Sequence, residues 1–292
     1  MSSSNVTASR SLNRARDPDK PWRPNTFVLG CRRTVVEIVL FNRDVASLFF
    51  ILLFPILIMG LFSTVFGDEP TFGAEGDVVD PITPAQYYLP GLIALGTILS
   101  GFQNLSGYVA AERYNGAIKR LAGTPLPPLS YFIGKTGLTL YLIVTQTVLL
   151  LLFAGFVMDV PMPTDPQQWF TFAWVLLLST GAWSMAGIAF ACLAKSAQSA
   201  ATLTVLPVLL LSFTSGVYFP FHRLPEWLQN IANVTPLRWT ASGMRSVFLP
   251  EGWEMAEPGQ AWHLGLSAVV ILLWLIVGLV VVRLTFKWPP QK

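Results

Sequence analysis

The sequence predicts an all-α integral membrane protein. We expect an amphipathic interfacial helix, then six membrane-spanning helices, with a re-entrant helix pair in the outer leaflet between the fifth and sixth spans. Two observations carry this prediction. Hydrophobic residues make up 53% of the chain and charged residues only 12%, whereas an average soluble domain is about 25% charged. The apolar residues are also gathered in long blocks without Asp, Glu, Lys or Arg.

Six such blocks predict the spans, because a hydrocarbon core of about 30 Å requires roughly 20 residues of helix. Five of them exceed this length and the last is just long enough. They are residues 45–67, 87–111, 136–158, 169–194, 196–221 and 264–282. We therefore expect residues 45–292 to form one six-helix membrane domain.

The distribution of Lys and Arg predicts the orientation in the membrane. With the N-terminus in the cytoplasm, all but three of the 19 Lys and Arg residues fall on the cytoplasmic side; the exceptions are Arg223, Arg238 and Arg245. The positive-inside rule then predicts a multi-pass protein of a cell membrane with both termini in the cytoplasm. The net charge of +3 gives no indication of nucleic acid binding.

The part of the chain before the first span divides into a tail and a helix. Residues 1–24 are rich in Ser, Asn, Arg and Pro, which predicts a disordered cytoplasmic tail. In residues 25–44, four apolar residues recur at helical spacing, Val28, Cys31, Val35 and Ile38. Charged residues lie between them, namely Arg32, Arg33 and Glu37. We expect an amphipathic helix on the inner membrane surface with its cations near anionic headgroups; a solvated linker helix is the alternative.

The charged island at residues 112–135 connects the second and third predicted spans. It is expected to sit in water at a membrane face while both its ends are held in lipid, so it can contact a soluble partner and pull on two helices. We expect its first part, 112–125, to be a coupling segment that is helical through Gly116. The sequence Gly134-Lys135-Thr136 ends like a phosphate-binding loop, but position 129 is Leu where that loop needs Gly. We therefore expect no nucleotide site in this chain.

Several polar and aromatic side chains fall within or beside the second and fifth spans. Amides inside a bilayer tend to face a bundle interior or a wet cavity, either for contacts between helices or for contact with a transported molecule. In the first alternative, the amides of Gln103 and Asn104 form hydrogen bonds to a neighbouring helix. The candidates for a substrate pathway are Phe102, Gln103, Asn104, Tyr108, Phe213 and Thr214.

The stretch at about residues 219–249 predicts two short outer helices. One starts at Pro225 and the other at Thr235 and Pro236. Both are too short to span and too apolar to float free, so we expect them to be re-entrant and packed against the bundle. The residues assigned to this pair are Pro220, Pro225, Trp227, Pro236, Arg238, Trp239 and Arg245. Burying either Arg in hydrocarbon costs a few kcal/mol, so we expect both to point to water, headgroups or Glu226.

Catalysis within this chain is not indicated. The two histidines, His222 and His263, are expected near the outer face, there is no HExxH motif, and the predicted spans carry no acidic or basic residue. No metal site is indicated, and no ring of charge that would suggest a passive channel. An intramembrane enzyme or a channel remains only as a distant alternative.

Two stretches carry a resemblance to a known family. The island ERYNGAIKRLAGTPL resembles the cytoplasmic motif of ABC-2 type permeases, where an acidic-Arg pair, a Gly four residues on, a Leu and a Thr-Pro recur in this order. The stretch SGVYFPFHRLPEWLQNIANVTPLRW resembles the family's segment after its fifth span. Together with the six-span layout, the resemblance covers nearly the whole chain after Asn25. Departures occur at Tyr114, Asn115, Ala117, Arg238 and Trp239.

The resemblance implies the fold of type V exporters and a subunit of an ATP-driven exporter in a bacterial membrane, of the daunorubicin-resistance type. Two permeases would pair as a homodimer or a related heterodimer, and movement of the first, second and fifth spans at their interface would release the substrate outside. Each permease would be served by a separate ABC ATPase subunit that binds ATP and Mg²⁺, two copies per transporter; this chain would hold no cofactor. The coupling residues would be Glu112, Arg113, Gly116, Lys119, Arg120, Leu121, Thr124 and Pro125.

Two substrate classes stay open. The aromatic and weakly polar pathway candidates favour a hydrophobic or amphipathic compound such as a drug, antibiotic or lipid. The alternative is a polysaccharide or lipid-linked glycan, which would need a wide channel ringed by aromatic residues; Trp174, Trp183 and Trp239 keep it open.

Overall fold

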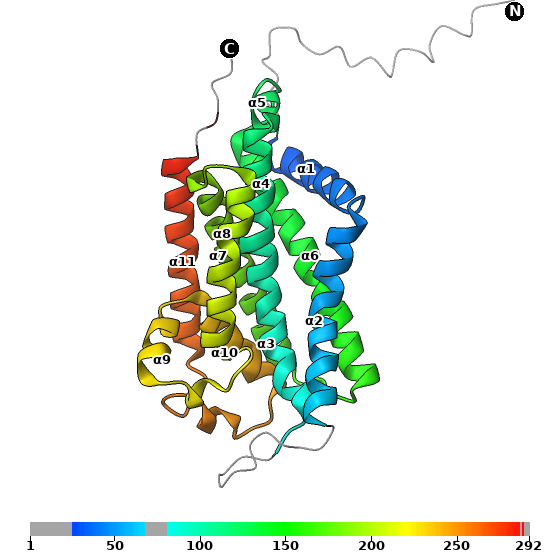
Figure 1. The fold of residues 1–292 in the computed structure, drawn as a ribbon, viewed down its shortest axis with the longest axis vertical. Coiled ribbons are helices and arrows are strands. Elements are labelled where there is room, and N and C mark those ends of the chain that lie inside the picture. The colour runs from blue at the N-terminus through cyan, green and yellow to red at the C-terminus, as the bar shows by residue number, and fades with distance from the viewer. Residues whose placement is uncertain (1–24, 68–80, 287, 289–292) are drawn as a thin grey trace, which may run out of the picture.

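The computed structural model describes residues 25–67, 81–286 and 288, and every regular element in these ranges is helical. The predicted tail at residues 1–24 lies outside the described residues. The long helices run side by side as a bundle (Figure 1), with α1 across one end and α9 and α10 at the other. We call the end that carries α1 and α5 the α5 face, and the opposite end the α9 face.

Within the described ranges, five helices are long and apolar enough to cross a membrane, which supports a multi-pass membrane protein. They are α2 (Val45–Phe66), α6 (Pro128–Val157), α7 (Pro166–Leu193), α8 (Ala197–Thr214) and α11 (Leu264–Thr285). Asp44, Asp165 and Ser196 cap the starts of α2, α7 and α8 by accepting hydrogen bonds from backbone N–H groups of their first turns.

The predicted span at residues 87–111 is interrupted. It consists of α3 (Pro84–Ile98), a π-helical turn at Leu99–Asn104, and α4 (Leu105–Tyr114). All of α3 is buried in the centre of the bundle. At the π turn the backbones of two helices meet, because a Cβ on Gly187 of α7 would run into the carbonyl oxygen of Gly101. The six-span layout therefore stays a prediction at this helix.

Two predicted boundaries are wrong. Helix α6 begins at Pro128 and not at residue 136, so Lys135 lies within the helix. The reason is that Lys135 is paired with carboxylates and need not reach water. Helix α8 ends at Thr214 and not at residue 221, because the chain turns at Gly216, whose φ of +78° is a left-handed conformation that favours glycine.

The predicted amphipathic helix is α1 (Thr26–Phe41), which starts at Asn25, whose side chain accepts from the N–H groups of Phe27 and Val28. It lies across α6 (Figure 1). Its buried side carries Gly30, Glu37 and Phe41, whereas Val28 and Val35 are exposed. Close contact is possible because Gly30 has no side chain: a Cβ there would lie 2.6 Å from Ile133. Glu37, which the sequence placed only between the apolar residues of this helix, is therefore on its buried side.

The remaining short elements complete the two faces. Helix α5 (Ala117–Ala122) protrudes from the bundle beside α1 (Figure 1). At the other end lie α9 (Glu226–Asn233), α10 (Pro236–Phe248) and two 3-10 turns, Phe221–Arg223 and Trp253–Ala256. The main apolar core joins α3, α6, α7 and α10.

Candidate functional site

The centre of the α5 face is a buried group of ionic side chains from three helices, which we call the α1–α4–α6 cluster. It consists of Arg33 and Glu37 on α1, Glu112 on α4, and Tyr131 and Lys135 on α6. Lys135 Nζ lies 2.7 Å from Glu112 Oε1 and 2.9 Å from Glu37 Oε2. The lysine therefore ties α6 to both other helices at once.

The other members complete the pairing of the two carboxylates. Arg33 Nη2 lies 2.5 Å from Glu37 Oε1 and 3.7 Å from Glu112 Oε1. The Tyr131 hydroxyl donates to Glu112 Oε2 over 2.8 Å. The two cations and two carboxylates balance in charge, which is what allows Lys135 to be only 1% exposed. These ion pairs and hydrogen bonds thus connect α1, α4 and α6 at the base of α5.

This cluster corrects two predictions. The charged island was expected to sit in water at a membrane face with its ends held in lipid, but its two end residues are held by protein: Lys135 is buried and Glu112 is turned towards it. Arg33 was expected near lipid headgroups, but it points to Glu37 and Glu112. The physical reason is the same in both cases: nearby carboxylates stabilise the cation more than water or headgroups do at that position. Those of Lys135 come from two other helices, whereas the nearest one to Arg33 is Glu37 of the same helix.

The coupling segment is two helices joined by a sharp turn, not one helix through Gly116. Gly116 has a φ of +76°, and the Asn115 side chain accepts from the N–H group of Ala117 over 3.0 Å. The Arg120 guanidinium reaches back to the carbonyl oxygen of Asn115 over 3.2 Å. This turn makes α5 a separate projection at the end of α4.

The projection ends in a stretch that leads into α6. The Thr124 hydroxyl donates to the carbonyl oxygen of Leu121 over 2.6 Å, and Pro125 follows at the surface. The exposed side chains of this projection include Tyr114, Asn115, Lys119, Arg120, Thr124 and Pro125. Leu121 is half-buried. The predicted coupling residues therefore divide into an exposed set on α5 and a set below it, Glu112 and Arg113, that holds α4.

Arg113 and Tyr114 attach the end of α4 to the end of α7. Arg113 Nη1 donates to the carbonyl oxygen of Ala191 over 2.6 Å, and the Tyr114 hydroxyl donates to that of Ala194 over 2.7 Å. Carbonyls in the last turn of a helix have no partner within the helix, so they are free to accept these bonds. A displacement of α5 would thus be felt by α1, α4, α6 and α7.

The comparisons with known proteins agree with this arrangement. The ABC-2 type transporter family matches residues 33–249, which include the cluster, α5 and the two short helices of the α9 face. This chain belongs to the ABC-2 type transporter family. Membership implies a permease of an ABC transporter, working with a separate ABC ATPase.

The permease is similar to three curated relatives. It is 23% identical over 199 residues to the inner membrane transport permease YadH of Escherichia coli K12, covering 67% of this chain and 74% of YadH. It is 21% identical over 207 residues to the putative transport permease ycf38 of Cyanophora paradoxa, covering 69% and 71%. It is 25% identical over 168 residues to the probable multidrug ABC transporter permease YbhR of Escherichia coli K12, covering 56% and 44%.

The six predicted pathway residues have different surroundings in the described part of the chain. Phe102 packs on Trp183 and Phe190 of α7, with ring centroids 5.8 and 5.4 Å apart. Tyr108 packs on Phe41 of α1, at 5.7 Å. Gln103 and Asn104 lie in the π-helical turn and are half-buried, as is Thr214. Phe213, near the α9 face, is exposed.

The α9 face holds a second buried ionic group that the sequence reasoning missed. Glu257 accepts from Arg238 Nη2 over 2.5 Å and from Arg245 Nη1 over 2.6 Å. Arg245 also donates to the carbonyl oxygen of Gly216, and the Arg238 guanidinium lies 3.9 Å from the centre of the Phe221 ring. The expectation that both arginines face water, headgroups or Glu226 is therefore wrong.

The electrostatics of Glu257 follow from this geometry. Burial alone would raise the pKa of this carboxyl, but the charges of Arg245 and Arg238 outweigh it and hold the pKa below its ordinary value. The carboxylate thus stays ionised and joins α10 to the loop before α11. No sequence pattern pointed to it, because Glu257 stands among turn residues without helical periodicity.

The two outer helices differ in their surroundings. Nearly all of α10, which begins at Pro236, is buried against α3, α7 and α11, and Trp239 Nε1 donates to the carbonyl oxygen of Asn233 over 2.7 Å. Helix α9, which follows Pro225, exposes Trp227 and Ile231. Pro220 ends the turn before Phe221. The structure thus shows α10 packed against the bundle. The re-entrant position of both helices in the membrane stays a prediction.

Proposed function

We propose that this permease is the membrane subunit of an ATP-driven exporter, in which a separate ABC ATPase docks on the α5 face. The observation that carries the proposal is that α5 projects from the bundle and exposes Lys119 and Arg120, while the α1–α4–α6 cluster, Arg113 and Tyr114 join its base to the helices below. A partner that binds α5 differently in two states can therefore shift the bundle between two states. The ATP and Mg²⁺ would be held by that partner.

The distribution of basic residues supports the same proposal. The α5 face carries many of the basic residues of the described chain, among them Arg32, Arg113, Lys119, Arg120 and Arg283. The positive-inside rule favours this face in the cytoplasm, where ATP is available. By analogy with the name of YadH, we place the permease in a bacterial inner membrane.

A second permease subunit would complete the transport pathway. Few residues of α2 and α8 are buried within the subunit: 17% and 22% of their most apolar stretches, compared with 67% for α7; α11, at 22%, is similar. Helices α2 and α8 lie against α3 and α4, respectively. Pairing of two copies across this face would bring Gln103, Asn104, Tyr108, Phe213 and Thr214 towards the subunit interface. The pathway would then lie between subunits, which accounts for the separation of its residues within one.

The substrate we propose is a hydrophobic or amphipathic compound moved outward, such as a drug, antibiotic or lipid. YbhR, a relative, is named as a probable multidrug permease. The rival glycan reading needs aromatic residues around an open channel, but Trp183 and Trp239 are buried. Trp183 also stacks near Trp274 within the subunit, with ring centroids 6.4 Å apart. Their burial favours the amphipathic substrate.

The test is affinity purification of the tagged full-length permease from its own cells in mild detergent, with ATPase activity measured on the eluate. Site-specific crosslinking then locates the contact. In a background with Cys31→Ala and Cys192→Ala, Lys119→Cys is expected to crosslink to a co-purifying ATPase in intact membranes. The matched control is Glu226→Cys, which is equally exposed but on the α9 face. Crosslinking from position 226 but not from 119 would overturn the docking proposal.

The same two cysteine variants test the orientation. A membrane-impermeant thiol reagent added outside cells is expected to label position 226 and not position 119. The reverse pattern would contradict the predicted topology. ATPase turnover of the purified complex, measured with amphipathic compounds and with glycan lipids, then separates the two substrate classes.

A further inference from the structure

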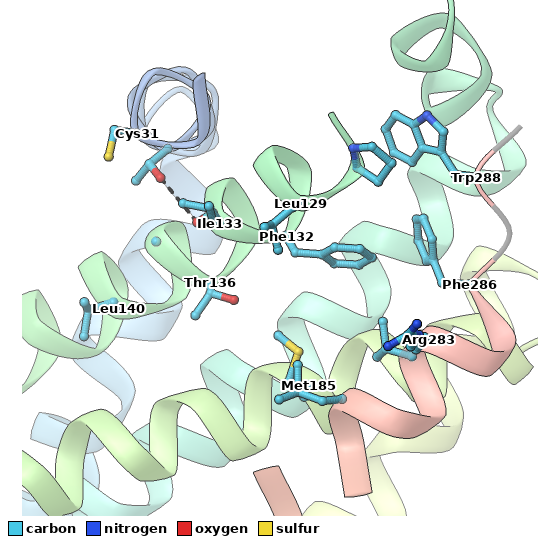
Figure 2. Close-up of a pocket in the computed structure, with 15 residues that line it drawn as sticks. Cys31, Leu129, Phe132, Ile133, Thr136, Leu140, Met185, Arg283, Phe286 and Trp288 are labelled. Atoms are coloured by element: carbon cyan, nitrogen blue, oxygen red, sulfur yellow. Dashed lines mark hydrogen bonds between the residues drawn. The ribbon is translucent and has the colours of Figure 1, made fainter. Parts of the chain in front are cut away.

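A large apolar cavity lies beside the α1–α4–α6 cluster but is separate from it. It has a volume of about 850 Å³ and is enclosed by α1, the first half of α6, α7 and the end of α11 (Figure 2). Its walls include Leu129, Phe132 and Leu140 of α6, Met185 of α7 and Phe286 after α11. The cavity is open on one side, and none of the predicted coupling or pathway residues lines it. The proposed transport cycle therefore assigns no role to the residues that line this cavity.

The dimensions of the cavity match one leaflet of a bilayer. Its lining on α6 extends from Pro128 to Leu140, which corresponds to about 18 Å of helix. Half of a hydrocarbon core is roughly 15 Å thick. Thr136 and Gly137 lie about two thirds of the way along this wall. A single acyl chain of the leaflet at the α5 face would thus fit along α6, in contact with apolar side chains over most of its length.

The polar end of the cavity carries a cation. Arg283 lies in the last turn of α11 and lines the cavity together with Phe286 and Trp288. Arg283 is exposed, and no carboxylate of the described residues lies within 4.0 Å of its guanidinium. Arginine and tryptophan near the end of an apolar helix are typical of the level where hydrocarbon meets headgroups. The charge is therefore free to pair with a phosphate at that level.

We infer that this cavity is a binding site for an anionic diacyl phospholipid of the leaflet at the α5 face. An acyl chain lies along α6 between Pro128 and Leu140, and Arg283 pairs with the headgroup phosphate. Charge complementarity selects an anionic lipid over a zwitterionic one, because nothing acidic among the cavity-lining residues offsets Arg283. The lipid would also fill the space between α1 and α11, so it would stabilise the docked position of α1.

The experiment uses the full-length permease in lipid nanodiscs of phosphatidylcholine, and it requires neither ATPase nor transport. A trace of phosphatidylglycerol with a photoactivatable acyl chain is added to one sample, and the same probe with a choline headgroup to another. After illumination, labelled peptides are mapped by mass spectrometry. We expect the glycerol probe to label residues 128–140 and 279–286 more strongly than the choline probe does.

Two variants and one control make the result specific. Arg283→Gln is expected to reduce labelling by the glycerol probe about five-fold at these residues, the loss anticipated for one cationic contact near a membrane surface. Thr136→Phe is expected to reduce labelling by both probes, because the ring fills the groove. Arg32→Gln removes the same charge from an exposed position on α1 that does not line the cavity, and it should leave labelling unchanged.

Three outcomes would overturn the inference. Equal labelling by the two probes would mean that the groove does not select the anionic headgroup. Unchanged labelling in Arg283→Gln would remove the role of that side chain. Labelling of α2 but not of the groove would show that the acyl chain of the probe does not enter the groove. None of these three outcomes would bear on the proposed docking of an ATPase on α5, because that contact is measured by a separate crosslinking experiment.

Discussion

Lys135 of α6 and Glu112 of α4 are joined by an ion pair with 2.7 Å between Nζ and Oε1. The two residues stand on either side of α5 in the sequence, so the pair closes the base of the projecting segment. Glu37 of α1 is held by the same ammonium group. The coupling segment and the interfacial helix α1 are therefore connected to each other through Lys135.

Lys135→Met is expected to destabilise the permease by about 3–5 kcal/mol, because it leaves the buried Glu37 and its neighbour Glu112 without their shared cation. Methionine keeps most of the volume and apolar stem of lysine, so the effect reports the lost charge. The measurement is thermal unfolding of the purified permease in detergent.

The control for this prediction is Lys119→Met, which changes the same residue type at an exposed position on α5 and should be nearly neutral in stability. Adding Glu37→Gln to Lys135→Met should recover part of the loss, because it removes one of the stranded carboxylates. If Lys135→Met unfolds at the temperature of the parent, the cluster does not hold the helices together.

Arg113→Gln is expected to separate ATPase binding from transport. The substitution removes the charged hydrogen bond to Ala191, a class of contact that contributes about 1.5–3 kcal/mol, while the exposed surface of α5 is unchanged. The ATPase should still co-purify, and transport should fall about ten-fold if this contact is lost from the coupled state. Both are measured on the same preparation.

Arg120→Gln provides the contrast. Arg120 bonds to the carbonyl oxygen of Asn115 within the projection and is exposed, so its loss should weaken docking of the ATPase. Loss of co-purification in Arg113→Gln and its retention in Arg120→Gln would reverse the roles that we assign to the two arginines.

Gly116 substitutions are expected to follow backbone preference and not side-chain size. The φ of +76° costs an L-residue about 1–2 kcal/mol, less for Asn, and proline cannot adopt it. Space is available, since the nearest atom to an added Cβ is Arg120 Nη1 at 3.8 Å. Transport should thus decrease from Gly to Asn to Ala and be lost in Gly116→Pro, with unchanged amounts of inserted protein.

Gly123→Ala is the matched control, because Gly123 ends the same short helix with an ordinary φ of −75° and an added Cβ would lie 3.4 Å from its nearest neighbour. It should transport nearly as well as the parent. Equal loss of transport in Gly116→Asn and Gly116→Pro would argue against a conformational requirement at this turn.

The long apolar helices were predictable because hydropathy is a local property of the sequence. The ends of α2, α7 and α11 lie within about one turn of the predicted spans. Helix α8 was predicted too long because the predicted span was defined by the absence of charged residues. The residues from Ser215 to Phe221 are also uncharged, although the helix has already ended at Thr214. Composition can show that a segment is in the membrane, but the turn depends on the backbone at Gly216.

The buried charges could not be predicted from local pattern. Lys135 is 98 residues away from Glu37 in the sequence, and Arg238 is 19 residues from Glu257. An isolated charged side chain is expected to face water, because burying it alone costs free energy. This expectation fails where a carboxylate that is distant in the sequence pairs with the cation and offsets the cost of burial. Arg33 differs from these residues, because its nearest carboxylate, Glu37, is only four residues away in the same helix. The site was thus identified by its motif, while its internal pairing required the fold.

Glu257 gives the last prediction, a dependence of stability on pH. Burial raises the pKa of Glu257, but Arg245 and Arg238 more than reverse this, so its pKa in the folded state is lower than in the unfolded state. Its contribution to stability is then fully present above the unfolded pKa, roughly 4.3, and is lost as the pH falls through the lower folded pKa. The unfolding temperature in detergent should be insensitive to this group above about pH 5.

Glu257→Gln is expected to lower stability at pH 7 by about 3–5 kcal/mol, because Arg238 and Arg245 would remain buried without a counter-charge. The variant should also lose the part of the acid dependence below about pH 4.3 that belongs to this carboxyl. Glu251→Gln, in the same loop but exposed, should change neither property. A Glu257→Gln permease as stable as the parent at pH 7 would show that the ionic group does not hold α10 in place, and the link between α10 and the loop before α11 would then rest on apolar packing alone.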